Sequence, residues 1–130
     1  MRENKGRALR ITADEDPLCN VPCFKGELVA RLRRKMPDDE SLDRGRSLFA
    51  ALGDRHRLRI LSALDGGDEL CVCDVAHVLG VGVSVASHHL RKLRDLGILK
   101  DRDDGKMVYY SLREASVAKM VARVLTGASR

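Results

Sequence analysis

The chain is poor in aromatic residues, since its 130 residues include two Phe, two Tyr and no Trp. A hydrophobic core must therefore be built from Leu, Val, Ile and Ala, and dimerisation through terminal helices would be one way to enlarge it. No apolar run approaches about 18 residues, the length that crosses a bilayer as a helix, so we expect no membrane partner. The segment Met1–Arg10 is basic without an apolar stretch behind it, and we therefore predict a cytoplasmic protein without a secretory signal.

Patterns typical of catalysis are also missing. The sequence has no Gly-rich phosphate loop, no Ser-His-Asp pattern or carboxylate pair with a plausible pocket, and no second domain to form a cleft. We therefore predict that the protein is not an enzyme. What the chain does have is basic charge: 24 Lys and Arg against 19 Asp and Glu give a net charge of +5 at pH 7. This balance favours a polyanionic partner such as nucleic acid.

Four cysteines form two close pairs, Cys19 with Cys23 and Cys71 with Cys73. In a reducing cytoplasm, such pairs more often bind metal or perform redox chemistry than form structural disulfides. Thiolates suit Cd(II), Pb(II) or Zn(II), and a site of four sulfurs suits tetrahedral cadmium or zinc. Because Cys71 and Cys73 are two residues apart, they can share one ion only in the first turn of a helix or before it. A thiol-redox or persulfide sensor, and a structural role, stay open as alternatives.

Hydrophobic spacing predicts a mainly α (α+β) chain with three parts. Residues 1–40 are predicted to form a mobile N-terminal tail and a basic helix over Gly26–Met36, a part that carries Cys19 and Cys23. Residues 41–126 are predicted to form the DNA-binding and dimerisation domain, and residues 127–130 a short tail. Helices are expected over 42–52, from an Asp54 cap to 64, over 72–79, from a Ser84 cap to about 96, and over 114–125.

Strand-like segments over 98–102 and 107–112 flank Asp103-Asp104-Gly105-Lys106, a sequence typical of a hairpin turn. The two preceding helices are joined by Gly80-Val81-Gly82, which is typical of a helix-turn-helix. A helix-turn-helix followed by a β-hairpin is a winged helix. The sequence therefore predicts a winged helix-turn-helix with a β-hairpin wing.

The helix that starts near Ser84 has an apolar face, Ala86, Leu90 and Leu93, and a polar face that suits the major groove. Of the adjacent His88 and His89, one is expected to meet DNA and the other to pack. Basic residues around this helix and in the wing, including Arg94 and Lys100, are expected to neutralise phosphates. The predicted DNA-binding residues are Ser84, Ser87, His88, His89, Arg91, Lys92, Arg102 and Lys106. A winged helix that binds another protein stays open as an alternative.

Four segments resemble the ArsR/SmtB family of metal-responsive winged-helix repressors: Leu52–Leu61, Glu69–Asp74, Ala86–Leu93 and Val108–Leu112. The string Glu-Leu-Cys-Val-Cys-Asp, together with the N-terminal Cys-x-x-x-Cys, is similar to the cadmium- and lead-sensing, CadC-type members. The resemblance implies a homodimer that binds operator DNA at an imperfect inverted repeat. It also implies that metal releases the repressor and induces an efflux or resistance gene.

The resemblance implies a metal site of Cys19, Cys23, Cys71 and Cys73, with one pair supplied by each protomer. The third cysteine of arsenic-sensing relatives is replaced by Ala76 here, which counts against arsenite as the inducer, although an arsenite sensor remains an alternative. A second family site on the last helix would fall at Glu114, Ser116, Gly127 and Arg130. At most one of these could bind metal, so we predict that this second site is absent.

Overall fold

A computed structural model describes residues 25–127 of the chain; residues 1–24 and 128–130, with Cys19 and Cys23, lie outside the described part. The chain divides into two units, residues 1–39 and 40–130. In the first unit, α2 spans Gly26–Lys35, which confirms the predicted basic helix, and all of its residues lie outside the core. Glu27 in its first turn and Arg33, Arg34 and Lys35 in its last turn complement the helix dipole. The three-part domain organisation stays a prediction.

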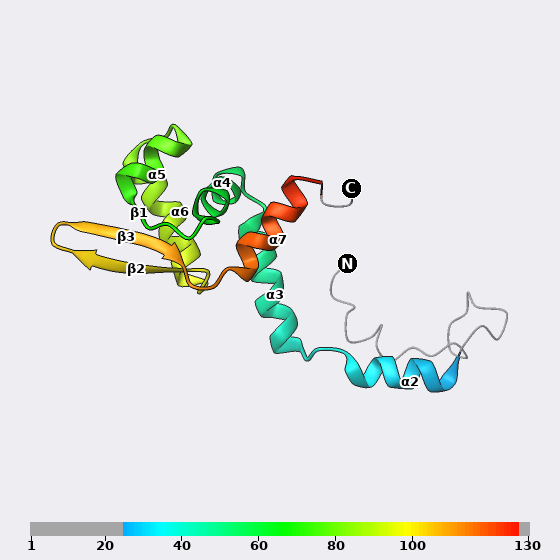
Figure 1. The fold of residues 1–130 in the computed structure, drawn as a ribbon. Coiled ribbons are helices and arrows are strands. Elements are labelled where there is room, and N and C mark those ends of the chain that lie inside the picture. The colour runs from blue at the N-terminus through cyan, green and yellow to red at the C-terminus, as the bar shows by residue number, and fades with distance from the viewer. Residues whose placement is uncertain (1–24, 128–130) are drawn as a thin grey trace. The chain divides into compact units, whose positions relative to one another are not determined.

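The second unit confirms the winged helix-turn-helix (Figure 1). The hairpin of β2 (Leu99–Asp104) and β3 (Met107–Leu112) extends away from the helices as the wing (Figure 1). In chain order the elements are α3 (Asp39–Leu52), α4 (Arg55–Leu64), β1 (Leu70–Cys71), α5 (Val72–Leu79), α6 (Val83–Asp95), β2 (Leu99–Asp104), β3 (Met107–Leu112) and α7 (Ser116–Leu125).

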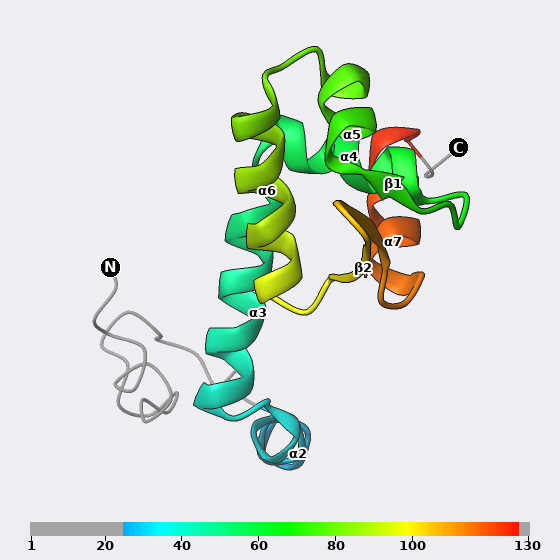
Figure 2. The same ribbon diagram turned by 90° about the vertical axis from the view of Figure 1, so that its left-hand side faces the viewer.

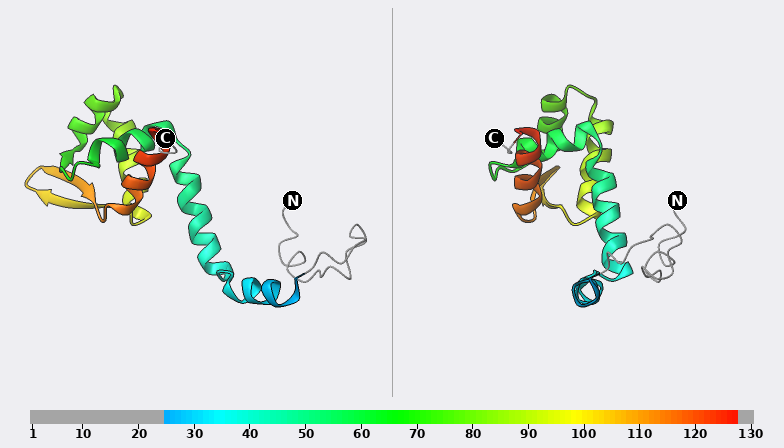
Figure 3. Two further views of the ribbon diagram at one scale, coloured as in Figure 1. Left: turned by 45° about the vertical axis from the view of Figure 1, so that its right-hand side comes forward. Right: turned by 90° about the vertical axis from the view of Figure 1, so that its right-hand side faces the viewer.

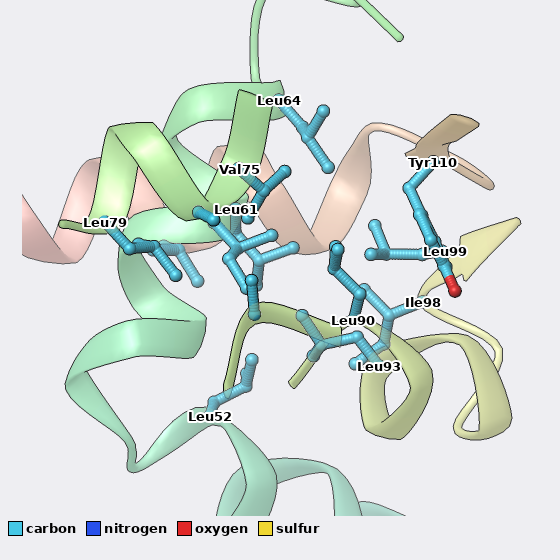
Figure 4. Packing of buried hydrophobic residues seen from close by; sticks show 14 residues of the cluster. Leu52, Leu61, Leu64, Val75, Leu79, Leu90, Leu93, Ile98, Leu99 and Tyr110 are labelled. Carbon is cyan, nitrogen blue, oxygen red and sulfur yellow. The ribbon is translucent and has the colours of Figure 1, made fainter. Parts of the chain in front are cut away.

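The core is aliphatic, as the shortage of aromatic residues predicts. Side chains from α4, α5, α6 and β2 meet at its centre, and Tyr110 lies at its edge (Figure 4). Fully burying one Leu, Ile or Val contributes roughly 1.5–3 kcal/mol relative to leaving it exposed. Burial of Leu90 and Leu93 therefore fixes which face of α6 points inward. The largest fully buried side chains are Ile60, Leu61, Leu64, Val75, Leu90, Leu93 and Leu99.

The sheet has three antiparallel strands in the order β1-β3-β2. The short strand β1 was not predicted; it pairs Leu70 with Tyr110 and Cys71 with Tyr109. The hairpin turn is confirmed, and it is tighter than predicted because β2 extends to Asp104, which pairs with Met107. Gly105 occupies the turn with φ of +65°, a left-handed conformation that Gly adopts without strain.

The starts of α4 and α5 agree with expectation, and those of α3, α6 and α7 differ. Helix α3 begins at Asp39 rather than at residue 42. Asp54 caps α4 as predicted, because its carboxylate accepts a hydrogen bond of 3.0 Å from the backbone N–H of Arg57. The predicted Ser84 cap is wrong: Gly82 precedes the first residue of α6, so Ser84 already lies inside the helix. Helix α7 begins at Ser116 rather than at residue 114. Within residues 25–127, no helix is long and apolar enough to cross a membrane.

Candidate DNA-binding surface and cysteine site

A tight turn sets the angle between the two helices of the helix-turn-helix. Gly80 ends α5 with φ of +70°, and its N–H donates to the carbonyl oxygens of Ala76 at 2.8 Å and His77 at 3.2 Å. The N–H of Val81 also donates to Ala76, at 3.1 Å. This left-handed ending satisfies the last carbonyls of α5 and turns the chain sharply into α6. The turn lies at the outer end of both helices (Figure 2).

Helix α6 presents a polar face away from the core. Ser84, His88, Arg91 and Lys92 are exposed, and Ser87 is half-buried. The Arg91 guanidinium donates a hydrogen bond to the Ser87 hydroxyl, four residues earlier on the same face. Five polar side chains with both donors and acceptors are suited to the edges of base pairs in the major groove.

His89 lies on the inner side of α6 and is only 9% exposed. Its Nδ1 is 3.8 Å from the Asp54 carboxylate, and its ring lies 5.2 Å from the rings of both His56 and His88, measured between centroids. Burial lowers the pKa of His89, and the Asp54 carboxylate opposes this shift. Positive charge on Arg57, His56 and His88 lowers the pKa of His89 further. His89 is therefore favoured as the neutral form, and its position between α6 and α4 leaves it out of the exposed polar face.

The carboxylate of Asp54 contacts both α4 and α6. Burial alone would raise its pKa, but the N–H of Arg57 and the nearby His89 and Arg57 charges hold that pKa below its usual value. Arg57 also donates from Nε to the carbonyl oxygen of Ala51 at 2.9 Å. These contacts connect the end of α3, the start of α4 and the inner face of α6.

Two basic residues expected to meet phosphates are already paired within the protein. Arg94 donates to Asp101 at 3.0 Å and to Asp95 at 3.1 and 3.2 Å, so its charge is largely compensated. Arg102 of β2 donates two hydrogen bonds to Glu69, at 2.8 and 3.0 Å. By contrast, Lys106 is exposed in the hairpin turn.

Arg102 has further contacts beside Glu69. Its Nη1 lies 3.8 Å from the Asp104 carboxylate. Its guanidinium carbon lies 5.0 Å from the centre of the Tyr109 ring, a distance typical of a cation–π contact. The hydrogen bonds from Arg102 lower the pKa of Glu69. Because Tyr109 pairs with Arg102 on one side and with Cys71 on the other, one row of residues runs from the wing to β1.

Cys71 and Cys73 lie at the start of α5. This is the position at which two cysteines two residues apart are expected to be able to bind one ion. Cys71 precedes the first residue of the helix and is 6% exposed, whereas Cys73 lies in the first turn and is exposed. The N–H of Cys71 donates to the Asp74 carboxylate at 3.4 Å. Both thiols are free.

Cys71 and Cys73 are two of the four predicted metal ligands. Over residues 25–127, no group of three or more His, Cys, Asp or Glu side chains is placed to hold a metal ion. Cys19 and Cys23, the other two predicted ligands, lie outside the described residues. Ala76, the position of the third cysteine in arsenic sensors, is buried in the core. At the second family metal site, near the last helix, Glu114 accepts a hydrogen bond of 2.9 Å from Ser116. The absence of a metal site there stays a prediction.

An apolar groove of about 240 Å³ lies where the end of α3, the start of α4 and the face of α7 meet. Figure 3 shows α7 beside the C-terminal end of α3. Phe49 of α3 is 61% exposed and Val124 of α7 is 73% exposed, which is unusual for side chains of this size. The groove is lined by Phe49, Leu52, Gly53, Leu58, Met120, Val121, Val124 and Leu125.

Comparison with known proteins agrees with this arrangement. Residues 54–101 match the model of the bacterial regulatory protein, arsR family. The cadmium resistance transcriptional regulatory protein CadC homolog of Staphylococcus aureus is 39% identical over 106 residues, which cover 82% of this chain and 87% of that protein. The transcriptional repressor SmtB homolog of Synechocystis is 41% identical over 114 residues, covering 85% of this chain and 83% of the relative.

Solved structures show the same fold. The homodimeric winged helix-turn-helix DNA-binding domain of Mb0332 from Mycobacterium bovis, a possible ArsR-family regulator, superposes with a TM-score of 0.61 at 29% identity. The superposition covers 72% of this chain and 88% of that one. The chain therefore belongs to the ArsR/SmtB family of metal-responsive, DNA-binding transcriptional repressors, which are regulators rather than enzymes.

Proposed function

We propose that the protein represses a metal efflux or resistance gene and that Cd(II), Pb(II) or Zn(II) releases it from its operator. The inducing ion would bind the thiolates of Cys19, Cys23, Cys71 and Cys73. The observation that carries the proposal is the position of Cys71 and Cys73 at the first turn of α5, the helix that leads through one tight turn into α6. The cadmium-resistance regulators among the relatives support Cd(II) as one of these ions.

The DNA-contacting half of the proposal rests on α6 and the wing. Ser84, Ser87, His88, Arg91 and Lys92 would face the major groove, with the Arg91 fork suited to a guanine. Lys106 at the tip of the wing, and Arg102 once released from Glu69, would contact phosphates. We leave the buried His89 out of this set, since its Nδ1 faces Asp54 rather than the polar face.

The partner in the proposed assembly is a second copy of the chain. The apolar groove and the exposed Phe49, Val124 and Leu125 offer a surface that water would otherwise cover. The homodimeric relative supports this use of the winged-helix fold. A symmetric dimer would present two α6 helices to the two halves of an imperfect inverted repeat. It would also allow the N-terminal cysteines of one protomer to reach Cys71 and Cys73 of the other.

The sheet offers a route from the metal to the wing. Cys71 pairs with Tyr109, and Tyr109 contacts the Arg102 guanidinium, which Glu69 holds two residues before Cys71. A shift of Cys71 on metal binding would therefore move residues that position the wing. A preference of metal for the DNA-free form of about 2–3 kcal/mol would weaken operator binding roughly 30- to 150-fold. Linkage then requires operator DNA to weaken metal binding by the same factor.

The first test is an anaerobic titration of the fully reduced protein with Cd(II), followed by the sulfur-to-metal charge-transfer absorption. We expect about one ion per protomer and an intensity that matches four thiolates. The double variant Cys19→Ser/Cys23→Ser should keep about half of that intensity, since Cys71 and Cys73 remain. A signal that this double variant leaves unchanged would remove the N-terminal pair from the site.

The same samples separate the metal sensor from a thiol-redox or persulfide sensor. Cys73 is an exposed free thiol, which favours that alternative enough to test it. A redox sensor would lose operator affinity on treatment with oxidant in the absence of metal, and its mass would fall by two hydrogens as a disulfide forms. A persulfide sensor would instead lose affinity on treatment with a polysulfide, which donates sulfane sulfur, and its mass would rise by one sulfur. Retained affinity under oxidant, together with release by Cd(II), would support the metal sensor.

A further inference from the structure

The first turn of α6 carries two exposed valines. Val83 is 51% exposed and Val85 is 41% exposed, and they flank the polar Ser84. Both lie in the first turn of α6. Figure 2 shows this end of α6 next to the turn that joins it to α5. Inward-facing Ala86, Leu90 and Leu93 already supply the contacts by which α6 packs on the core. The two valines are therefore not needed to hold the helix in place.

These valines stand where a recognition helix approaches base edges. In helix-turn-helix proteins, residues near the N-terminus of the second helix contact the bases in the major groove. Valine has neither a donor nor an acceptor, so it cannot select guanine, cytosine or adenine by hydrogen bonds. The one apolar group that base pairs present in the major groove is the 5-methyl of thymine.

We propose that Val83 and Val85 recognise thymine 5-methyl groups, so that each operator half-site presents thymine where the first turn of α6 enters the major groove. The inference rests on the proposed entry of α6 into that groove. It assigns the apolar part of sequence recognition to the two valines, and the hydrogen-bonding part to Ser84, Ser87, His88 and Arg91.

The expected size of the effect follows from burial of one methyl group. Removing a buried methyl changes affinity by about three- to fourfold. Because a dimer would contact two half-sites, the matching change in both halves should weaken binding by roughly tenfold. The neighbouring phosphates and hydrogen bonds are unaffected, since deoxyuridine differs from thymidine only by that methyl group.

The experiment uses the full-length, reduced, metal-free protein and a duplex that it selects from a random-sequence pool. Each thymidine of the selected duplex is then replaced by deoxyuridine, symmetrically in both half-sites, and the affinity is measured by fluorescence anisotropy. We expect roughly tenfold weaker binding at one or two thymidine positions per half-site. Val83→Ala or Val85→Ala should bind the thymidine duplex more weakly and should lose the penalty for deoxyuridine at the corresponding position.

A matched control is Val78→Ala. Val78 is a 58% exposed valine on α5, outside the first turn of α6, and its variant should keep both the affinity and the penalty. Unchanged affinity for every deoxyuridine duplex would overturn the inference about the valines. It would leave the proposed function as a DNA-binding repressor standing, because the protein would still select a defined sequence. A penalty that persists in both alanine variants would overturn the assignment to these valines. Failure to select any duplex would overturn the proposed function together with the inference.

Discussion

Asp54 provides the sharpest test of how the scaffold holds the DNA-contacting helix. Its carboxylate accepts the N–H of Arg57 at 3.0 Å, which caps α4, and lies 3.8 Å from Nδ1 of His89 on α6. At neutral pH the imidazole of His89 is favoured as the neutral form because burial lowers its pKa. The cap should therefore account for most of what Asp54 contributes to stability at neutral pH.

Replacing Asp54 by Ala should lower the free energy of unfolding by about 0.5–2 kcal/mol, the usual cost of losing a side-chain cap. For a domain of this size, 1 kcal/mol corresponds to roughly 4–8 °C in Tm. The control is Asp54→Asn, which removes the charge but keeps an oxygen that can accept the N–H of Arg57. We expect Asp54→Asn to lose only a small part of what Asp54→Ala loses.

The assay is thermal unfolding followed by far-ultraviolet circular dichroism near pH 7.5, at one fixed protein concentration because dimerisation would make Tm concentration-dependent. Equal losses in the two variants would refute the capping argument, since they would attribute the effect to charge. No loss in Asp54→Ala would show that another group satisfies the first turn of α4.

Two further predictions concern charge. Burial lowers the pKa of His89 below 6.5 in the folded protein. As the pH drops, His89 therefore takes up its proton in the unfolded chain before it does so in the folded protein. The free energy of unfolding should then fall between about pH 6.5 and the lowered pKa. Urea unfolding at several pH values should show this loss, and His89→Gln should flatten it; an identical pH profile in that variant would contradict the assignment. Glu69→Ala should remove both hydrogen bonds to Arg102 and free it for phosphate contact, so operator binding by the metal-free dimer should strengthen. The slope of log K against log salt should steepen by about 2. An unchanged slope would mean that Arg102 does not reach the DNA.

Much of the fold follows from local sequence patterns. The spacing of Leu90 and Leu93, the cap at Asp54 and the Asp-Gly turn each depend on neighbouring residues, and the structure confirms all three. Strand β1 was missed because two residues carry no periodicity; Leu70 and Cys71 become a strand only through their pairing with β3, about 40 residues later.

The candidate site was less predictable for the same reason. Sequence shows that Arg102 is basic, but not that Glu69, 33 residues earlier, holds its guanidinium. Helical spacing from Ala86 and Leu93 already places His89 on the inner face of α6, but local spacing does not reveal its contact with Asp54 of the α4 cap. Val83 and Val85 gave no signal at all, because an exposed valine is indistinguishable from a core valine until the fold is known.

Helix α5 has only eight residues, so about 12 Å of helix separates the thiols at its start from the glycine turn at its end. Of the residues that would bind the inducer, Cys71 and Cys73 lie shortly before the α6 residues that would read DNA, whereas Cys19 and Cys23 lie in a separate, earlier part of the chain. An engineer could exchange the ligand pair around Cys71 while keeping α6, or graft a different first turn onto α6 while keeping the thiols. If metal binds at Cys71 and Cys73 and α6 reads DNA as proposed, the fold would suit a modular biosensor, in which the analyte and the reporter promoter are changed at separate sites.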